Sequence, residues 1–208
     1  ARPIVLLAKK DPDSLMELSF SRRLGVMLPY SPLHTLLIDG MYGGPDILVM
    51  TSGNLSGCPV LTENEEAILA LKDTADGFLL HNRRIQNRCD DSLAAEWRGA
   101  PYFLRRSRGF APRPLEFTPD ADGIFALGAE QKASFALGKY SHVFLSPYIG
   151  DLKNAETFAH YTDTLHTYEK LFRLKPSLYV CDLHPDYLSS QEARRVAGEK
   201  GLPLLKVQ

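Results

Sequence analysis

Small polar residues follow directly on an apolar segment in LVMTSGNLSG, residues 48–57. Hydroxyls, a side-chain amide and the open backbone N–H groups beside glycines are what phosphate-binding concavities use. The candidates here are Thr51, Ser52, Asn54 and Ser56. The P-loop pattern G-x-x-x-x-G-K-S/T does not occur. An ordinary Ser- and Asn-rich turn before a helix has the same composition, and spacing alone favours that turn.

An arginine cluster forms the second candidate, because residues 83–113 contain eight arginines and no lysine. They are Arg83, Arg84, Arg88, Arg98, Arg105, Arg106, Arg108 and Arg113. Arginine offers planar, bidentate donors that match phosphate and carboxylate, so its use without lysine favours anion binding. A solvated basic strand edge explains the cluster equally well. An RNA-binding patch explains it less well, because the interleaved aromatic residues form no stacking motif.

Carboxylates and imidazoles give two weaker signals. RCDDSL places Asp90 and Asp91 beside Ser92, a set that orients Mg²⁺ on a nucleotide or simply caps a turn. Among the histidines, His184 in DLHPD is the candidate for a functional role, with a structural histidine as the alternative. No H-x-x-x-H, H-E-x-x-H or C-x-x-C pair occurs, so local spacing indicates neither a metal site nor a disulfide framework.

The elements that must position these residues alternate between strands and helices. DILVM, residues 46–50, and DGFLLHN, residues 76–82, are predicted to be strands. Thr62 and Glu65 fit a capping box that starts a helix. That helix is predicted to carry Ile68, Leu69 and Leu71 inward. The order predicts an α/β or α+β fold with a twisted sheet and polar loops at strand ends.

A second part follows the proline-rich stretch 109–123. Two adjacent strands joined by a turn near Gly138 are predicted first. Apolar residues then recur at 3, 4, 3, 4 spacing from Phe158 to Phe172, one face of a helix. A strand, a polar loop, a helix ending near Gly201 and a last strand complete the chain. The predicted domains are residues 1–112 and 124–208, with 113–123 as a linker.

Overall composition excludes some classes of protein. The 208 residues carry a net charge of −1 and 44% hydrophobic residues, so there is no global attraction to nucleic acid or membrane. The apolar runs fall short of the roughly 20 residues of a membrane span, and no signal peptide opens the chain, so a cytoplasmic location is expected. Both ends of the sequence have the composition of strand interiors and not of frayed polar termini. We therefore expect the chain to be a fragment of a longer protein.

Several stretches resemble one family. MLPYSPLHTLL, LVMTSGNLSG, ADGFLLHNR, RCDDSL and LRRSRGFAP resemble the later part of the YrdC-like domain of HypF, the hydrogenase-maturation carbamoyltransferases. LGAEQKASFAL, LSPYIGDL and DLHPDYLSS resemble the start of that family's TsaD-like domain, which has an actin-like ATPase-superfamily fold. The resemblance covers nearly the whole chain.

The resemblance implies an ATP-dependent carbamoyltransferase or ligase. Such an enzyme makes carbamoyl-adenylate from carbamoyl phosphate and ATP. It then passes the carbamoyl group to the C-terminal cysteine of the partner HypE, for the cyanide ligand of nickel-iron hydrogenases. ATP and Mg²⁺ are the implied cofactors, while zinc and a TsaD-type metal are expected only in parts of the family pattern that this sequence lacks. No membrane partner is implied, and nucleic acid is not favoured.

Site residues follow from the same resemblance. Ser52 and Asn54 match a Ser-x-Asn nucleotide element, with Thr51 and Ser56 nearby. Ser92 and either Arg105 or Arg106 match phosphate-contacting positions. The second-domain candidates are Lys132, Asp151 and His184, although QKAS departs from the family's LKNT at Gln131 and Ala133. No catalytic residue and no metal ligand is assigned in this segment, which is expected to be incomplete as an enzyme when taken alone.

Two alternative functions remain open. A tRNA threonylcarbamoyl-adenylate synthase shares the nucleotide element, but its pattern does not ordinarily continue into GAEQKAS and DLHPDY. A non-catalytic RNA-binding or scaffold module would use the arginine cluster, and steeply salt-dependent RNA binding would support it.

Overall fold

Two compact units make up the protein. The computed structural model describes every residue apart from the side chain of Tyr42. The first unit comprises Ala1–Ser52 and Asp91–Phe110, and the second comprises Gly53–Asp90 and Ala111–Gln208. Each unit contains strands and helices, which confirms the expected mixed α/β class.

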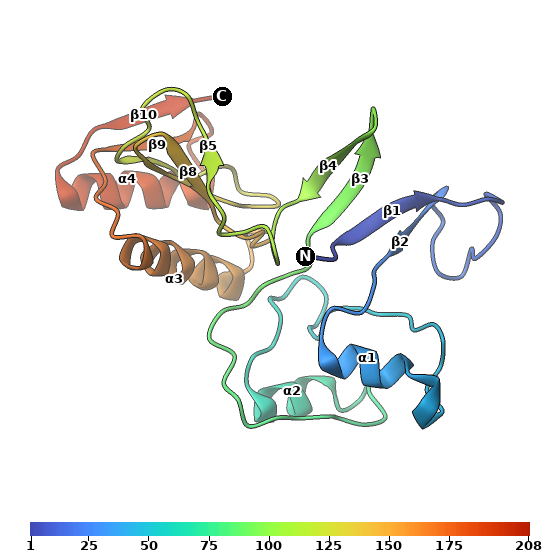
Figure 1. Cartoon of the computed structure of the whole chain (residues 1–208). Helices are drawn as coiled ribbons and strands as arrows, with labels where there is room; N and C mark the ends of the chain where they lie inside the picture. Colours follow the sequence, from blue (N-terminus) through green and yellow to red (C-terminus); the bar gives the residue numbers. More distant parts are fainter. The chain divides into compact units, whose positions relative to one another are not determined.

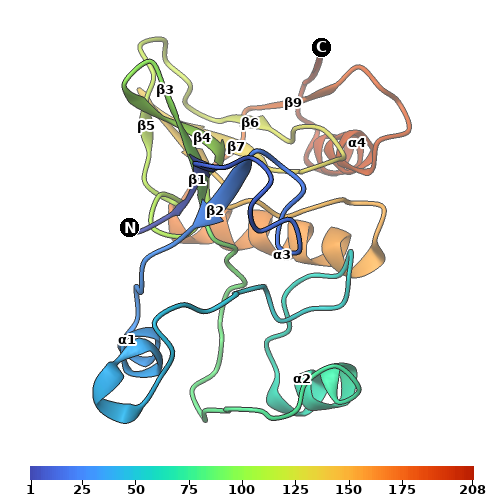
Figure 2. The same ribbon diagram turned by 90° about the vertical axis from the view of Figure 1, so that its right-hand side faces the viewer.

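A four-stranded sheet in the order β2-β1-β3-β4 forms the frame of the first unit. Its strands are β1 (Ile4–Ala8), β2 (Arg23–Val26), β3 (Leu93–Trp97) and β4 (Ala100–Arg105). β1 runs antiparallel to β2 and parallel to β3, and β3 runs antiparallel to β4 (Figure 1, Figure 2). The pairing of β1 with β3 therefore ties together the two separate segments of this unit.

Helix α1 (Pro32–Ile38) lies in the SPLHTLLIDG stretch, residues 31–40. The Ser31 hydroxyl accepts a hydrogen bond from the His34 backbone N–H at 3.1 Å, and Pro32 occupies the first turn, where its missing N–H costs nothing. The helix has no buried residue. The short 3-10 helix η1 (Gly40–Tyr42) follows it.

A six-stranded sheet in the order β10-β9-β6-β7-β8-β5 forms the frame of the second unit, with helices α3 and α4 along one face (Figure 1). The strands are β5 (Leu115–Glu116), β6 (Ile124–Ala126), β7 (Ala136–Lys139), β8 (His142–Leu145), β9 (Leu178–Asp182) and β10 (Leu204–Val207). The helices are α2 (Asn64–Leu71), α3 (Ala155–Leu171) and α4 (Leu188–Lys200). No described helix is long and apolar enough to cross a membrane.

The core of the second unit is built around α3, as its periodicity predicted. Tyr161, Leu165 and Tyr168 are buried on one face of the helix. The Phe135 ring meets both tyrosine rings edge-on, at centroid distances of 5.7 and 5.4 Å. The Tyr161 hydroxyl donates to the Leu127 carbonyl at 2.6 Å, so the buried phenol is satisfied. Burial also raises the pKa of Tyr161 far above its ordinary value.

Two segments predicted as strands are not strands. Residues 46–50 and 76–82 carry no strand pairing, and large side chains in them are exposed, Ile47 by 84% and Leu79 by 74%. A strand needs partners for its backbone N–H and C=O groups, which apolar composition alone does not supply. Both predictions are therefore wrong.

Helix α2 is where a helix was expected, but its details differ. It begins at Asn64 with Glu63 as the N-cap, and no side chain caps it, so the capping box of Thr62 and Glu65 does not form. No α2 residue is buried, and Leu69 is 69% exposed. Ile68 is also exposed and Leu71 is only half-buried, so the expectation that this helix carries Ile68, Leu69 and Leu71 inward is wrong.

Gly138 lies inside strand β7 and not in the expected turn. The region holds three strands, and the hairpin turn between β7 and β8 falls at Tyr140 and Ser141. A Cβ at Gly138 would lie 1.8 Å from the Ala121 carbonyl oxygen. The glycine is there because another backbone segment approaches the strand closely. β5 also lies within the predicted linker, while the domain boundaries themselves stay a prediction.

Gly138→Ala should destabilise the protein, because the new methyl group would overlap the Ala121 carbonyl. Overpacking of this kind costs about 1–3 kcal/mol in the free energy of unfolding, which urea denaturation measures. Gly198→Ala in α4 is the matched control, because nothing lies within 4 Å of a Cβ there. Since alanine favours the helix, that variant should be neutral or more stable. Equal stability of the two variants would contradict the close approach at Gly138.

Candidate functional site

The TSGNLSG segment is a loop that closes on Asn54. The Asn54 side-chain amide donates to the carbonyls of Leu55 and Cys58, at 2.9 and 3.0 Å. The Leu61 N–H donates to the Gly53 carbonyl at 3.1 Å, which closes the same loop. Asn54 therefore holds the loop in shape with its N–H groups, while its Oδ1 oxygen makes no hydrogen bond within the described chain.

The predicted nucleotide site is divided between the two units. Thr51, Ser52, Ser92, Arg105 and Arg106 belong to the first unit, whereas Asn54 and Ser56 belong to the second. Thr51, Ser52 and Ser56 are exposed, as a ligand-binding role requires. The structure describes each group separately, so a single site formed from all of these residues stays a prediction.

Ser92 lies inside the first unit. Its side chain is fully buried, and its hydroxyl donates to the Arg108 carbonyl at 3.0 Å and accepts from the Ser107 N–H at 2.8 Å. The hydroxyl therefore ties the start of β3 to the segment that follows β4. A phosphate could reach it only if these bonds were exchanged.

Arg108 anchors the same region, a role that the sequence analysis missed. Its Nε lies 2.6 Å from an Asp91 carboxylate oxygen, and its Nη atoms donate to the backbone oxygens of Ala1 and Arg2 at 3.2 and 3.3 Å. The guanidinium also lies 3.3 Å from the centroid of the Tyr30 ring. The sequence signal was present, because Asp91 and Arg108 were both noted, but only the fold pairs them.

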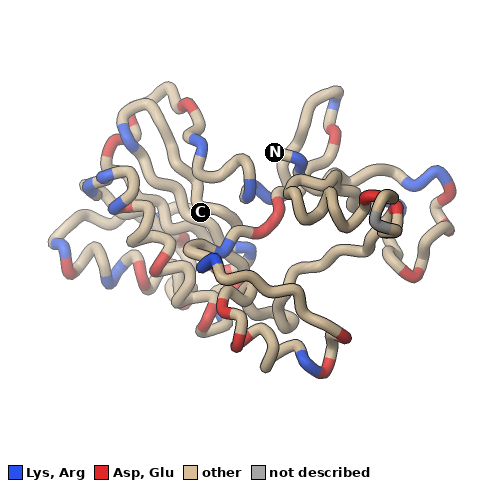
Figure 3. Tube along the Cα trace, turned by 60° about the horizontal axis from the view of Figure 1, so that its bottom comes forward, with Lys and Arg blue, Asp and Glu red and all other residues tan. Residues whose placement is uncertain are grey.

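The arginines of the cluster are divided between the two units. Arg98, Arg105, Arg106 and Arg108 belong to the first unit, and Arg83, Arg84, Arg88 and Arg113 to the second. Figure 3 shows basic and acidic residues intermingled along the chain trace. Arg105 and Arg106 are both half-buried, so exposure does not choose between them as the phosphate contact.

Glu130 connects the three loops that carry the second-domain candidates, and sequence analysis did not single it out. Its backbone carbonyl accepts from the Leu152 N–H at 3.1 Å, next to Asp151. Its carboxylate accepts from the Leu188 N–H at 2.7 Å, in the first turn of α4. Tyr187, the N-cap residue of α4, provides no side-chain cap. The 5% exposed Glu130 therefore caps this helix from another loop.

The candidate side chains on these loops do not bond to one another. Lys132 is exposed and has a positive φ of 51°. Asp151 accepts from the Lys153 N–H at 3.1 Å and so shapes its own turn. The exposed His184 ring stacks on Tyr187 at a centroid distance of 4.2 Å, and its Nδ1 accepts from the Asp186 N–H at 3.3 Å. Across the described chain, no group of three or more His, Cys, Asp or Glu side chains is placed to hold a metal ion.

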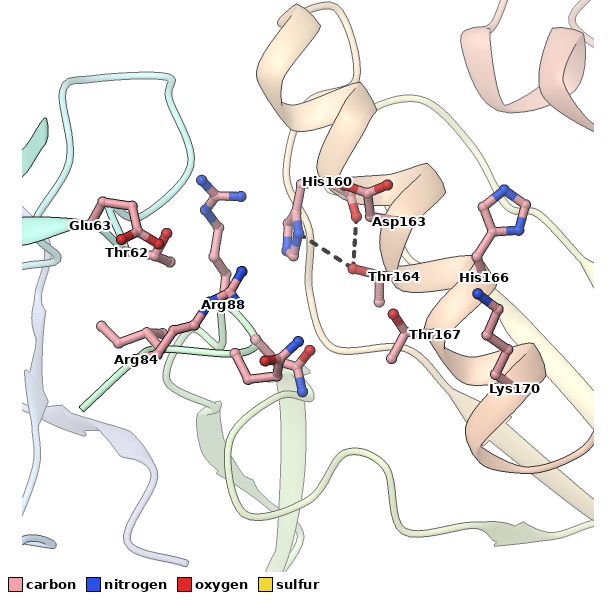
Figure 4. Close-up of a pocket in the computed structure, with 13 residues that line it drawn as sticks. Thr62, Glu63, Arg84, Arg88, His160, Asp163, Thr164, His166, Thr167 and Lys170 are labelled. Carbon is pink, nitrogen blue, oxygen red and sulfur yellow. Dashed lines mark hydrogen bonds between the residues drawn. The ribbon is translucent and has the colours of Figure 1, made fainter.

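A cavity of about 670 Å³ lies in the second unit, between the segment around residues 62–88 and helix α3 (Figure 4). Its lining is Thr62, Glu63, Arg84, Ile85, Gln86, Asn87, Arg88, His160, Asp163, Thr164, His166, Thr167 and Lys170. Sequence analysis noted Arg84 and Arg88 but not their α3 neighbours. Burial and, to a lesser degree, the Arg88 charge lower the pKa of His160, and the Asp163 charge opposes them.

Two family models match the chain. The Sua5/YciO/YrdC model, described as telomere recombination, matches residues 1–107. The HypF Kae1-like domain model matches residues 119–208.

Curated relatives align with the whole chain. It is 39% identical to the carbamoyltransferase HypF of Synechocystis sp., 40% to the probable carbamoyltransferase HypF of Methanocaldococcus jannaschii and 41% to the carbamoyltransferase HypF of Rhodobacter capsulatus. Each alignment covers 100% of this chain but only 27 to 28% of the relative. The chain therefore spans little more than a quarter of the length of these proteins.

Solved structures agree over the same extent. Full-length HypF in a phosphate- and nucleotide-bound form is similar with a TM-score of 0.85 at 42% identity. HypF of T. kodakarensis is similar with a TM-score of 0.90 at 39% identity. Both comparisons cover 100% of this chain, and 32% and 27% of the respective structures.

Glu130→Ala should destabilise the protein, because the Leu188 N–H at the start of α4 loses its acceptor. Loss of a helix cap costs about 0.5–2 kcal/mol in the free energy of unfolding, measurable by urea denaturation. Glu130→Gln keeps a side-chain oxygen and should lose less. A Glu130→Ala protein as stable as the parent would rule out the capping role.

His160 should remain neutral below its ordinary pKa of 6.5 while the protein is folded. Because its folded pKa is lowered, its contribution to stability is complete above pH 6.5 and is lost as the pH falls through the folded pKa. Arg88→Ala should raise the His160 pKa in an NMR titration, and Arg84→Ala, which is not among the causes of the shift, should leave it unchanged. An unchanged His160 pKa in Arg88→Ala would contradict the proximity of the two residues.

Proposed function

Because the chain belongs to the Sua5/YciO/YrdC family through residues 1–107, and is similar over its whole length to HypF carbamoyltransferases, we propose that it is part of a carbamoyltransferase of nickel-iron hydrogenase maturation. The observation that carries this proposal is the alignment of all 208 residues with those enzymes, at 39 to 41% identity in three organisms. The HypF Kae1-like match to residues 119–208 supports the same assignment.

The proposed first reaction is formation of carbamoyl-adenylate. Water first hydrolyses carbamoyl phosphate to carbamate and phosphate. An oxygen of the carbamate then attacks the α-phosphorus of ATP, and pyrophosphate leaves. Negative charge then develops on the phosphoryl oxygens, so the protein has to supply donors at that position. Hydroxyl, amide and guanidinium groups can donate hydrogen bonds to these oxygens.

The residues proposed to bind ATP are those predicted from the sequence: Thr51, Ser52, Asn54, Ser56, Ser92 and one of Arg105 and Arg106. The loop closed by the Asn54 amide supports this role, because a preorganised loop costs little ordering entropy when a ligand binds. The exposed hydroxyls of Ser52 and Ser56 are available to a phosphate. Ser92 fits less directly, because its hydroxyl is buried and already bonded on both sides.

Mg²⁺ is proposed to arrive with ATP. Asp91, one of the two carboxylates expected to orient the ion, is 2.6 Å from Arg108 and so already neutralised. The donor set of the described chain therefore does not fit a resident metal site at this place. Mg²⁺ is commonly bound through substrate phosphates and only one or two carboxylates, which is compatible with the predicted ATP site.

The proposed second reaction transfers the carbamoyl group to the C-terminal cysteine of HypE. In that step the thiol sulfur attacks the carbamoyl carbon and AMP leaves. Lys132, Asp151 and His184 are proposed to belong to this second site, and Glu130 holds their three loops together. The cytoplasmic location expected from the sequence stays a prediction.

The rival functions have less support. A threonylcarbamoyl-adenylate synthase would account for the Sua5/YciO/YrdC match but not for the HypF Kae1-like match to residues 119–208. An RNA-binding module would depend on the arginine cluster, which is divided between two units and partly used by the ion pair of Arg108.

ATP with Mg²⁺ should bind this chain saturably in a calorimetric titration at fixed salt. Asn54→Ala should abolish or strongly weaken binding, because the loop loses both amide hydrogen bonds. Ser52→Ala should weaken it about tenfold, the effect of losing one good hydrogen bond to a charged group. Asn82→Ala, an exposed asparagine outside the loop, is the control and should bind as the parent does.

Equal ATP affinity of Asn54→Ala and the parent would reject the role of this loop. Saturable binding that the loop variant loses would justify a second test in the longer enzyme that contains this chain: pyrophosphate release that depends on carbamoyl phosphate. Release that depends on threonine instead would identify the rival synthase.

A further inference from the structure

The cavity beside α3 gathers three cations that form no ion pair with an acidic side chain of the described chain. Arg84, Arg88 and Lys170 line it, and none of the three has a carboxylate within 4.0 Å anywhere in the described chain. Figure 4 shows the two arginines on one side and the α3 side chains on the other. Uncompensated cations that converge on one cavity attract an anion.

Both walls of the cavity are held in place by contacts outside it. On one wall, the Arg88 Nε donates to the Val60 carbonyl at 2.7 Å, which orients the guanidinium and leaves its Nη groups for a ligand. The other wall is the face of α3 that carries Thr164, Thr167 and Lys170. Another face of this helix is buried in the core, which fixes the position of α3 in the second unit.

Hydroxyl groups add neutral donors to the cations. Thr62 and Thr167 contribute hydroxyls with no hydrogen-bond partner in the described chain. The Thr164 hydroxyl donates to the His160 carbonyl at 2.7 Å, so its oxygen can still accept. Guanidinium, ammonium and hydroxyl donors together are the set that surrounds phosphate groups in proteins.

Charge and polarity also limit what the cavity can hold. Glu63 and Asp163 line it as well, so the three cations exceed the two anions by one positive charge when the histidines are neutral. Among the described residues that line it, only Ile85 is apolar, which disfavours a lipophilic ligand. A volume of about 670 Å³ is more than one phosphate needs and suits a diphosphate or a nucleotide-sized anion.

We propose that this cavity is a second anion site, which binds a small ligand carrying a phosphate or diphosphate group through Arg84, Arg88 and Lys170. The site does not include Ser52 or Asn54, so the inference is independent of the proposed ATP loop. It joins residues matched by the Sua5/YciO/YrdC model to residues matched by the HypF Kae1-like model within a single compact unit.

Calorimetric titration of the whole chain with pyrophosphate tests the inference. Arg84→Ala and Lys170→Ala should each weaken binding about tenfold or more, as expected for loss of a charge-assisted contact. Both side chains are exposed, so folding should be unaffected, and thermal melting of each variant checks this. Arg22→Ala and Lys175→Ala remove exposed cations outside the cavity and should leave the affinity unchanged.

Asn54→Ala separates this site from the proposed ATP loop. Pyrophosphate binding that persists in Asn54→Ala but is weakened in Arg84→Ala and Lys170→Ala supports the second site, whatever the fate of the ATP loop. ATP as the titrant in the Asn54→Ala background then shows whether the site takes a nucleotide as well as free diphosphate. No saturable pyrophosphate binding, equal weakening in the two control variants, or loss only in Asn54→Ala would each overturn the proposal.

Discussion

Helix α3 packs one side against the hydrophobic core and lines a polar cavity with another. The architecture of the second unit depends on this double role. Tyr161, Leu165 and Tyr168 pack one face against the sheet, where the Tyr161 hydroxyl is bonded to the Leu127 carbonyl. With 3.6 residues per turn, burying that face places Thr167 and Lys170 on another side of the helix, with the half-buried Thr164 at the boundary between the two. The same packing that stabilises the core thus builds a polar cavity wall, and the wall cannot shift without disturbing the core.

Apolar burial is distributed unevenly along the chain. The continuous core lies in residues 125–197, whereas many large apolar side chains before residue 90 are exposed. This difference explains why the periodic segment of α3 was predicted correctly while the runs at 46–50 and 76–82 were not. A run of apolar residues indicates that a segment is stabilised by burial. It does not indicate whether the rest of the fold supplies a surface against which the segment can pack.

At the candidate sites, polar residues serve structure more often than their types suggest. Ser92 and Asp91 have the chemistry of phosphate and Mg²⁺ contacts, yet in the first unit they bond to Arg108 and its neighbours. Glu130, which attracted no attention in the sequence, caps α4 and joins three loops. A buried polar group must find a partner, and which partner it finds depends on strands that are distant in sequence.

The sequence by itself determined the α/β class, the helices α3 and α4 with the end of α4 near Gly201, and the family resemblance carried by local motifs. These features depend on residues within one or two turns of each other, so spacing and capping are sufficient to reveal them. Only the tertiary structure decided that Gly138 lies under the Ala121 carbonyl, that Arg108 pairs with Asp91, and that Arg84 and Arg88 face Lys170 across a cavity. Each of those contacts joins residues 17 or more positions apart, and no local pattern encodes which distant backbone a residue will meet.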